Sequence, residues 1–454
     1  MYKIFRATLI SAIVTILVAC GGNFGFDGSS NMPHAIITMS DGSVTISGLS
    51  GSKSIVLLLN GKDPATFSTN GWSRFPTQVE VGWGYAFTVG TQPTGMTCSI
   101  GANGTGTVTG TSFHADVTCV NSPTAAFVYV ANSYSSTVSG YSINASTGAL
   151  TSLGAGFATG FIPYAVTVDP TGKFAYVPNA SSNTISAYSI NASTGTLTSV
   201  GPAVAAGTYP QAITIDPTDK FVYVANTASN NVSAYTINAL TGVLTSVGPA
   251  VAAGTNPSSV TVDTTGKFAY VVNLTDNTIS PYTINSTTGA LTSMGPAVAT
   301  GTHPTGMAID PKATFAYVTN GYSNTVSGYS INASTGALTS LGAGFATGAL
   351  PSSVAVDPMG KFVYVTNSND RTVSAYTINS VTGALTSIGT PVATGANPIS
   401  VAVDPAGIFA YVANMNDGTV SAYTINAATG ALTSAGAAVA TGSYPLSVTV
   451  APTQ

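Results

Sequence analysis

Charged side chains are scarce in this chain of 454 residues, where Asp, Glu, Lys and Arg together make up only 6%. An ordinary soluble domain has roughly 25%. The formal net charge is −4. Proteins that bind nucleic acid neutralise phosphates with clustered Lys and Arg, so this composition argues against a nucleic-acid partner. Hydrophobic residues reach 44%, which predicts a large core under a surface of Ser, Thr, Asn and Gly.

The chain also lacks long apolar runs, except at its N-terminus. Lys3 and Arg6 precede an apolar stretch from about residue 7 to residue 19. A bilayer span needs about 20 apolar residues, so this stretch is typical of a signal-peptide core instead. We therefore expect residues 1–19 to be a signal peptide.

The end of this stretch, Leu17-Val18-Ala19-Cys20, resembles a bacterial lipobox. The resemblance implies cleavage before Cys20 and acylation of its thiol and new amine, which would hold the protein at a membrane through lipid. Gly21 in the next position implies the outer membrane, facing the periplasm or the exterior. Ordinary secretion with cleavage after Ala19 is the alternative.

Cysteine is rare as well, since only Cys98 and Cys119 follow Cys20. No C-x-x-C pair is present to suggest a metal or redox site. An exported chain is oxidised, so we expect a Cys98–Cys119 disulfide. Such a bridge contributes about 3 kcal/mol to stability.

The remainder of the chain divides into three regions. Residues 20–40 are rich in Gly and Ser at first and predict a flexible tether. Residues 41–121 alternate apolar and polar positions between turn residues, which favours a small β-sandwich-like domain that serves as a spacer. Residues 122–454 carry an internal repeat.

The repeat has a constant period of 47 residues and no insertion. One tyrosine of each copy stands in a Y-V-x-N segment: Tyr129, Tyr176, Tyr223, Tyr270, Tyr317, Tyr364 and Tyr411. A period in the forties is typical of propeller blades. Each copy contains four strand-like runs, for example at 353–357, 361–367, 371–378 and 384–388.

The ends of the repeat are out of phase in a complementary way. The first Y-V-x-N has no P-x-x-V-x-V run before it, and the last such run, at 445–450, has no Y-V-x-N after it. We therefore predict an all-β, seven-bladed β-propeller with Velcro closure, in which the C-terminal strand joins the first blade. This closure leaves no free sheet edge.

The segments YVTN at 364–367 and YVAN at 129–132, 223–226 and 411–414 resemble the YVTN-type propeller repeat family. That family is grouped with the seven-bladed lactonase propellers, which include 6-phosphogluconolactonase. The resemblance implies the propeller fold and, as one reading, hydrolysis of a sugar lactone. Enzymes of the family place Arg, Glu and His at the channel mouth.

This chain departs from that pattern. Residues 127–450 contain no Glu, one Arg (Arg371) and one His (His303). We therefore assign no catalytic residue and expect no cofactor. Six aspartates recur at one repeat position and could ligate a cation together: Asp169, Asp216, Asp263, Asp310, Asp357 and Asp404. Capping of their own D-P-x-G turns explains them better, so no metal site is predicted.

One repeat position is variable, namely the residue before the repeat proline. Such a residue would lie beside the channel, at the start of the innermost strand, where differences among copies suit ligand recognition. We predict a ligand-binding ring at the channel mouth: Ile162, Tyr209, Asn256, His303, Leu350, Asn397 and Tyr444.

These observations favour a lipid-anchored, non-catalytic propeller of the cell envelope that binds a glycan or protein. A lactonase-type hydrolase acting on a sugar lactone is the alternative, and an assembly subunit is a third hypothesis. The sequence does not predict the oligomeric state.

Overall fold

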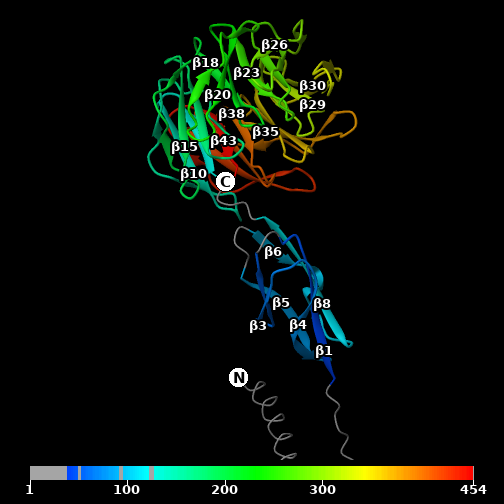
Figure 1. The fold of residues 1–454 in the computed structure, drawn as a ribbon. Coiled ribbons are helices and arrows are strands. Elements are labelled where there is room, and N and C mark those ends of the chain that lie inside the picture. Colours follow the sequence, from blue (N-terminus) through cyan, green and yellow to red (C-terminus); the bar gives the residue numbers. More distant parts are fainter. Residues whose placement is uncertain (1–37, 50–52, 92–95, 122–126, 453–454) are drawn as a thin grey trace, which may run out of the picture. The chain divides into compact units, whose positions relative to one another are not determined.

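The computed structural model describes residues 38–49, 53–91, 96–121 and 127–452. The predicted signal peptide, the lipidation site Cys20 and most of the tether lie outside these residues. The chain divides into two compact units, residues 1–121 and 122–454, which we treat separately (Figure 1). No helix in the described ranges is long and apolar enough to cross a membrane.

The N-terminal unit consists of two four-stranded sheets around one apolar core. One sheet has the order β4-β1-β8-β6 and the other β3-β2-β5-β7. The strands are β1 (Met39–Ser47), β2 (Ile55–Leu59), β3 (Lys62–Phe67), β4 (Gly71–Glu80), β5 (Gly84–Thr91), β6 (Met96–Ile100), β7 (Thr105–Thr107) and β8 (Ser112–Asn121), with a short 3-10 helix, η1 (Ala102–Gly104). β1 begins at Met39, two residues inside the segment predicted as tether.

The core of this unit contains Phe75, Phe87 and Phe113, which lie in contact with one another. The predicted disulfide is confirmed, because Cys98 on β6 and Cys119 on β8 are opposite each other in the ladder and bonded.

The C-terminal unit is a β-propeller, as predicted. Its described residues form seven sheets, each with the strand order first-second-third-fourth and a further two-residue strand paired to the third. The second strands are the Y-V-x-N segments and are buried along their whole length: β9 (Phe127–Asn132), β14 (Phe174–Asn179), β19 (Phe221–Asn226), β24 (Phe268–Asn273), β29 (Phe315–Asn320), β34 (Phe362–Asn367) and β39 (Phe409–Asn414).

The first, innermost strands follow the repeat prolines and line the propeller axis: β13 (Thr167–Val168), β18 (Pro210–Ile215), β23 (Pro257–Val262), β28 (Pro304–Ile309), β33 (Pro351–Val356), β38 (Pro398–Val403) and β43 (Pro445–Ala451). β43 pairs antiparallel with β9, with Val448 opposite Val130. The C-terminal strand is therefore the innermost strand of the first blade, and the ring is closed as predicted.

The third strands are β10 (Thr137–Ile143), β15 (Thr184–Ile190), β20 (Asn231–Ile237), β25 (Thr278–Ile284), β30 (Thr325–Ile331), β35 (Thr372–Ile378) and β40 (Thr419–Ile425). The fourth are β11 (Leu150–Ser152), β16 (Leu197–Ser199), β21 (Leu244–Ser246), β26 (Leu291–Ser293), β31 (Leu338–Ser340), β36 (Leu385–Ser387) and β41 (Leu432–Ser434). The two-residue strands are β12 (Phe157–Ala158), β17 (Val204–Ala205), β22 (Val251–Ala252), β27 (Val298–Ala299), β32 (Phe345–Ala346), β37 (Val392–Ala393) and β42 (Val439–Ala440).

The repeated tyrosines join neighbouring blades. The hydroxyl of Tyr176, in a Y-V-x-N segment, donates to the carbonyl of Gly242 in the next blade, at 2.9 Å. Tyr411 does the same across the closure, to Gly148 at 3.1 Å. Because a buried hydroxyl must be hydrogen-bonded, each tyrosine fixes the position of a turn in another blade as well as filling the core.

The asparagine that ends each Y-V-x-N segment is fully buried, and in every blade except the first it connects two parts of its blade. In the first blade Asn132 Oδ1 has no hydrogen-bond partner among the described residues. Asn179 donates from Nδ2 to Ser186 Oγ at 2.9 Å, and its Oδ1 accepts from Gly160 N at 3.0 Å. It therefore ties the hairpin that follows it to the loop that leads into the innermost strand.

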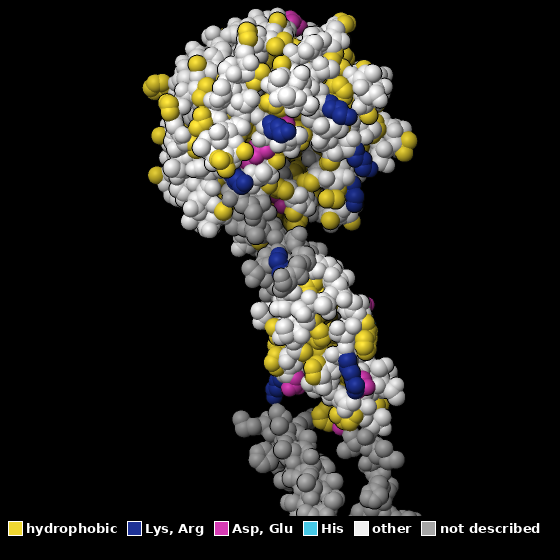
Figure 2. Space-filling view, in the orientation of Figure 1, with side chains coloured by type: hydrophobic (Ala, Val, Ile, Leu, Met, Phe, Trp, Pro, Cys, Tyr) yellow, Lys and Arg dark blue, Asp and Glu magenta, His cyan; other side chains and the backbone are white. Residues whose placement is uncertain are grey.

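The repeated aspartates cap their own turns, which confirms the turn interpretation. Asp263 Oδ1 accepts from the backbone N–H groups of Lys267 at 2.9 Å and Phe268 at 2.8 Å. Among the described residues the two ion pairs, Arg74–Asp41 and His114–Asp116, both belong to the N-terminal unit. Figure 2 shows how thinly charged side chains are spread over the visible face.

Asp219 occupies a repeat position where most other blades have glycine with positive φ, such as Gly172 and Gly266, and where the fifth blade has Ala313. Asp219 has φ 58° and lies close to Asp169 of the neighbouring blade. Partial burial, followed by the charge of Asp169 and its hydrogen bond, raises the pKa of Asp219 to about 6. The ionised carboxylate is therefore less favourable in the folded than in the unfolded chain.

We expect Asp219→Gly to stabilise the propeller at pH 7.5. Since the folded-state pKa is the higher one, the stability loss caused by Asp219 develops as the pH rises from about 4 to about 6 and is complete above that window. Solvent screening at this partly exposed site limits the gain to about 1–2 kcal/mol, or a few degrees in Tm. Calorimetry at pH 7.5 and pH 4 measures it.

Asp219→Asn is the matched control, because Asn tolerates positive φ and carries no charge. It should reproduce most of the gain at pH 7.5 and little of it at pH 4. An equal gain at both pH values in the two variants would assign the effect to backbone conformation rather than charge.

Candidate functional site

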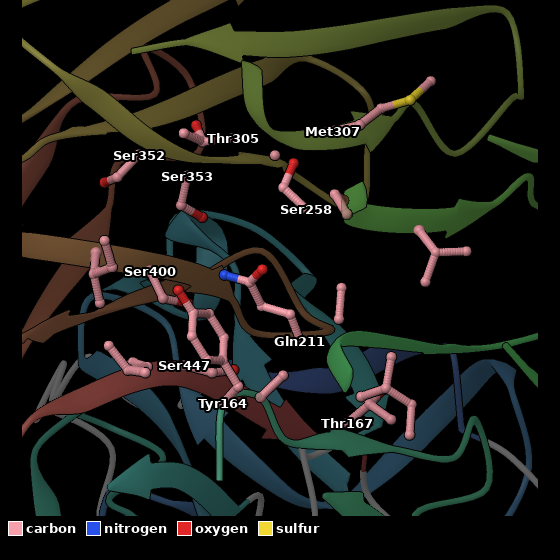
Figure 3. Close-up of a pocket in the computed structure, with 18 of the residues that line it drawn as sticks. Tyr164, Thr167, Gln211, Ser258, Thr305, Met307, Ser352, Ser353, Ser400 and Ser447 are labelled. Carbon is pink, nitrogen blue, oxygen red and sulfur yellow. The ribbon is translucent and has the colours of Figure 1, made fainter. Parts of the chain in front are cut away.

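A central cavity of about 470 Å³ lies among the innermost strands, and Figure 3 shows the side chains around it. This volume falls within the range of small-molecule sites. The residue directly after each repeat proline contributes to the wall: Tyr164, Gln211, Ser258, Thr305, Ser352, Ile399 and Leu446. Among the described lining residues none is Asp, Glu, Lys or Arg.

The predicted ring lies two residues earlier, on the other side of the repeat proline, and has a uniform backbone. All seven members have positive φ, between 53° and 57°. The carbonyl of each accepts a hydrogen bond from the residue after a Y-V-x-N segment, as Tyr209 O does from Thr227 N at 3.0 Å. Of the seven, His303 is the one that lines the cavity.

The lining position after the proline was not predicted from sequence. A signal was present, because this position varies among the copies as much as the position before the proline does. The strand-pairing pattern alone does not decide which of the two variable residues that flank the proline faces the axis. The positive φ before the proline turns the chain there, which brings the following residue to the cavity.

Two large polar side chains from adjacent blades meet at the cavity. Gln211 Oε1 accepts from Thr227 Oγ1 at 2.6 Å, and Gln211 is also hydrogen-bonded to the phenol of Tyr164. Figure 3 shows the amide and the phenol pointing into the cavity. Burial raises the pKa of Tyr164, so its hydroxyl is protonated at neutral pH and can donate a hydrogen bond.

The next three blades contribute small hydroxyl side chains to the cavity wall. Ser258, Thr305 and Ser352 donate to the carbonyls of the next blade's repeat proline, at 3.1, 3.2 and 2.8 Å. Their protons are used in joining blades, so toward a ligand these oxygens offer lone pairs. The cavity therefore combines donors on one side with acceptors on the other.

His303 is stacked on Tyr322, with ring centroids 4.0 Å apart. Its Nδ1 is buried and has no hydrogen-bond partner among the described residues. A proton on Nδ1 would be buried without an acceptor, which favours the tautomer with the proton on Nε2. His303 is accordingly suited to donating a hydrogen bond and poorly suited to acting as a base.

The chain was compared with known families and structures. The model of the family "Lactonase, 7-bladed beta-propeller" matches residues 122–256, 248–350 and 341–450. The search of curated proteins found no match.

Solved structures with the same fold include two putative 6-phosphogluconolactonases. The protein from Bacteroides uniformis is 17% identical, with a TM-score of 0.65, covering 72% of this chain and 99% of its own. The protein from Bacteroides fragilis is 20% identical, with a TM-score of 0.64, covering 73% and 99%.

A periplasmic gluconolactonase from Pseudomonas aeruginosa is 18% identical, with a TM-score of 0.63, covering 72% of this chain and 99% of its own. At these identities the structures establish the shared fold, and the family model covers most of the chain. The chain therefore belongs to the lactonase family of seven-bladed β-propellers.

Proposed function

We propose that the propeller is a lactone hydrolase that takes an uncharged sugar lactone into its central cavity. The observation that carries the proposal is the cavity itself: a chamber on the axis of a lactonase-family propeller, lined by hydroxyl, amide and imidazole groups. Such groups complement the hydroxyls and the carbonyl of a sugar lactone. With no Lys or Arg among the described lining residues, a phosphorylated lactone has no evident counter-charge there.

The chemistry follows from the donors. Attack of water on the lactone carbonyl places negative charge on its oxygen, and donors aimed at that oxygen stabilise the transition state. The Tyr164 hydroxyl, the Gln211 amide and His303 Nε2 are available for this role. No carboxylate lines the described cavity to activate the water, so we expect a modest acceleration of about 10²–10³-fold, as one or two oxyanion donors provide.

The test is proton release from D-glucono-1,5-lactone and from its 6-phosphate, measured with the full-length protein against the spontaneous rate. We expect turnover of the neutral lactone with a clear preference over the phosphorylated one. Leu240→Ser, at an exposed outer turn where other copies have Ser, controls for effects of mutagenesis and purification that do not involve the cavity. Rates equal to spontaneous hydrolysis for both lactones would contradict the proposal.

Non-catalytic binding of a sugar is the second candidate. It is favoured by the lack of charged side chains among the described lining residues. Saturable binding of the uncharged analogue D-glucono-1,5-lactam by calorimetry, without any turnover of the lactone, would support this candidate over hydrolysis. Anchoring through lipid on Cys20 remains a proposal from the lipobox resemblance for either candidate.

A further inference from the structure

Aromatic side chains gather at one end of the propeller, on the loops that lead into the innermost strands and on the turn between β9 and β10. They belong to three consecutive blades, and we name them the aromatic arc: Tyr134, Tyr444, Phe161 and Tyr209. Tyr134 stacks on Tyr444, with ring centroids 4.1 Å apart. Tyr209 meets Tyr164, which lines the cavity and is not part of the arc, edge to face at 6.3 Å. The arc is not required by the cavity site, and the inference drawn from it is independent of the proposed hydrolase activity.

The fold does not need aromatic residues at these positions. Where the first blade has Tyr134, the sixth and seventh have Asn369 and Asn416. Where the second has Phe161, the third has Thr208. Tyr134 and Phe161 are 68% and 72% exposed, so they contribute little to the core.

Hydrogen bonds fix the backbone of the loops that carry the arc. Tyr134 N donates to Ser443 O at 3.2 Å, and Ser181 N donates to Phe161 O at 3.2 Å. Tyr209 N donates to Asn183 Oδ1 of the preceding blade at 2.8 Å, which joins two of these loops. Because the loops are already ordered, a ligand that stacks on the rings does not have to order the backbone as it binds.

The surroundings of the arc are uncharged. The loop segments 133–136, 159–163, 180–183, 206–210, 227–230 and 441–445 contain no Asp, Glu, Lys or Arg, and besides the aromatic residues they are mostly Ser, Thr, Asn, Gly and Ala. The charged residues of this end, Asp276, Asp370, Arg371 and Asp417, belong to the corresponding turns of the fourth, sixth and seventh blades.

This combination selects one class of ligand. A nucleic acid is excluded as the main ligand, because these loops contain no Lys or Arg to bind its phosphates while its bases stack on the rings. Protein interfaces usually combine aromatic residues with Arg and Met, which these loops lack. Sugar rings present flat C–H faces to aromatic rings and hydroxyls to Ser, Thr and Asn.

We propose that the aromatic arc binds an uncharged polysaccharide chain, with successive pyranose rings stacked on Tyr134 and Phe161 and their hydroxyls bonded to the Ser, Thr and Asn side chains of the same loops. The site lies outside the cavity and needs no hydrolysis to work.

The test uses the full-length protein with cellohexaose, maltohexaose and chitohexaose as probes, measured by calorimetry. The variant Tyr134→Asn with Phe161→Thr carries residues that other blades already have at these positions, so it should fold. We expect saturable binding of at least one probe by the parent protein and a weakening of at least tenfold in the variant. Leu240→Ser, a repeat-equivalent change on an outer turn, should bind within about twofold of the parent.

Three results would overturn the proposal. One is no binding of any of the three probes at millimolar concentration by the parent protein. Another is equal binding by parent and double variant, which would place the sugar elsewhere. The third is arc-dependent binding to phosphatidylcholine vesicles without sugar binding, which would indicate a membrane-surface role. Lactone turnover is measured in a separate experiment. Failure of the polysaccharide proposal therefore leaves the hydrolase proposal unaffected, and the reverse also holds.

Discussion

Deleting residues 445–454 should leave the propeller unable to fold into a soluble monomer. The deletion removes β43, which forms the innermost strand of the first blade by pairing with β9 from Phe127 to Asn132. It also removes three buried side chains, Pro445, Val448 and Ala451. β9, buried along its length in the intact protein, would become an exposed apolar edge of the kind that promotes aggregation.

The size of this effect follows from ordinary magnitudes. Burial of a valine is worth about 1.5–3 kcal/mol, and each ladder hydrogen bond about 1 kcal/mol. The loss therefore exceeds about 5 kcal/mol, which is comparable with the whole stability of many domains. Size-exclusion chromatography and thermal unfolding measure it, and deletion of 453–454 alone is the control. A monomeric product whose Tm falls by less than about 5 °C would show that the ring does not depend on this closure.

Filling the central cavity should abolish lactone turnover without unfolding the protein. Gly306 lines the cavity and lacks the strained positive φ that would require glycine. A Cβ at this position would approach Thr319 Oγ1 at 3.5 Å and Ser352 O at 3.7 Å, which are ordinary contacts. Gly306→Phe therefore places a ring against the wall and takes space from the ligand.

We expect Gly306→Phe to lower kcat/KM for D-glucono-1,5-lactone by at least about 100-fold, because even a small misplacement of a substrate costs about that much. Gly306→Ala is the matched control, since it adds one methyl group and should keep activity within about threefold. Thermal unfolding of both variants should stay close to that of the parent. Undiminished turnover by a folded Gly306→Phe protein would place the reaction outside the cavity.

The fold could be predicted in detail because the repeat is nearly perfect. The 47-residue period predicted the number of blades, and the unmatched runs at the two ends predicted the pairing of β43 with β9. The two-residue strands such as β37 were not predicted, because Val392 and Ala393 are too short a run to show alternation.

The candidate site was predicted less well, for a physical reason. Variability identified the neighbourhood of the repeat proline, but which residue faces the axis depends on a positive φ that Ile162 or Leu350 would not suggest, since bulky residues rarely adopt it. Arg371 shows a related limit. It stands where Asn183 and Asn324 accept a hydrogen bond from the next loop, which a guanidinium cannot do. From the sequence, Arg371 could be recognised only as the one Arg among residues 127–450.

The location of the ligand is tested most directly by a crystal structure of the protein soaked with D-glucono-1,5-lactam, an uncharged and hydrolysis-resistant analogue of the proposed substrate. We predict density for the analogue in the central cavity, within hydrogen-bond distance of Tyr164, Gln211 and His303. Density at another place on the propeller, with an empty cavity at a saturating concentration of the lactam, would contradict the assignment of the cavity as the site.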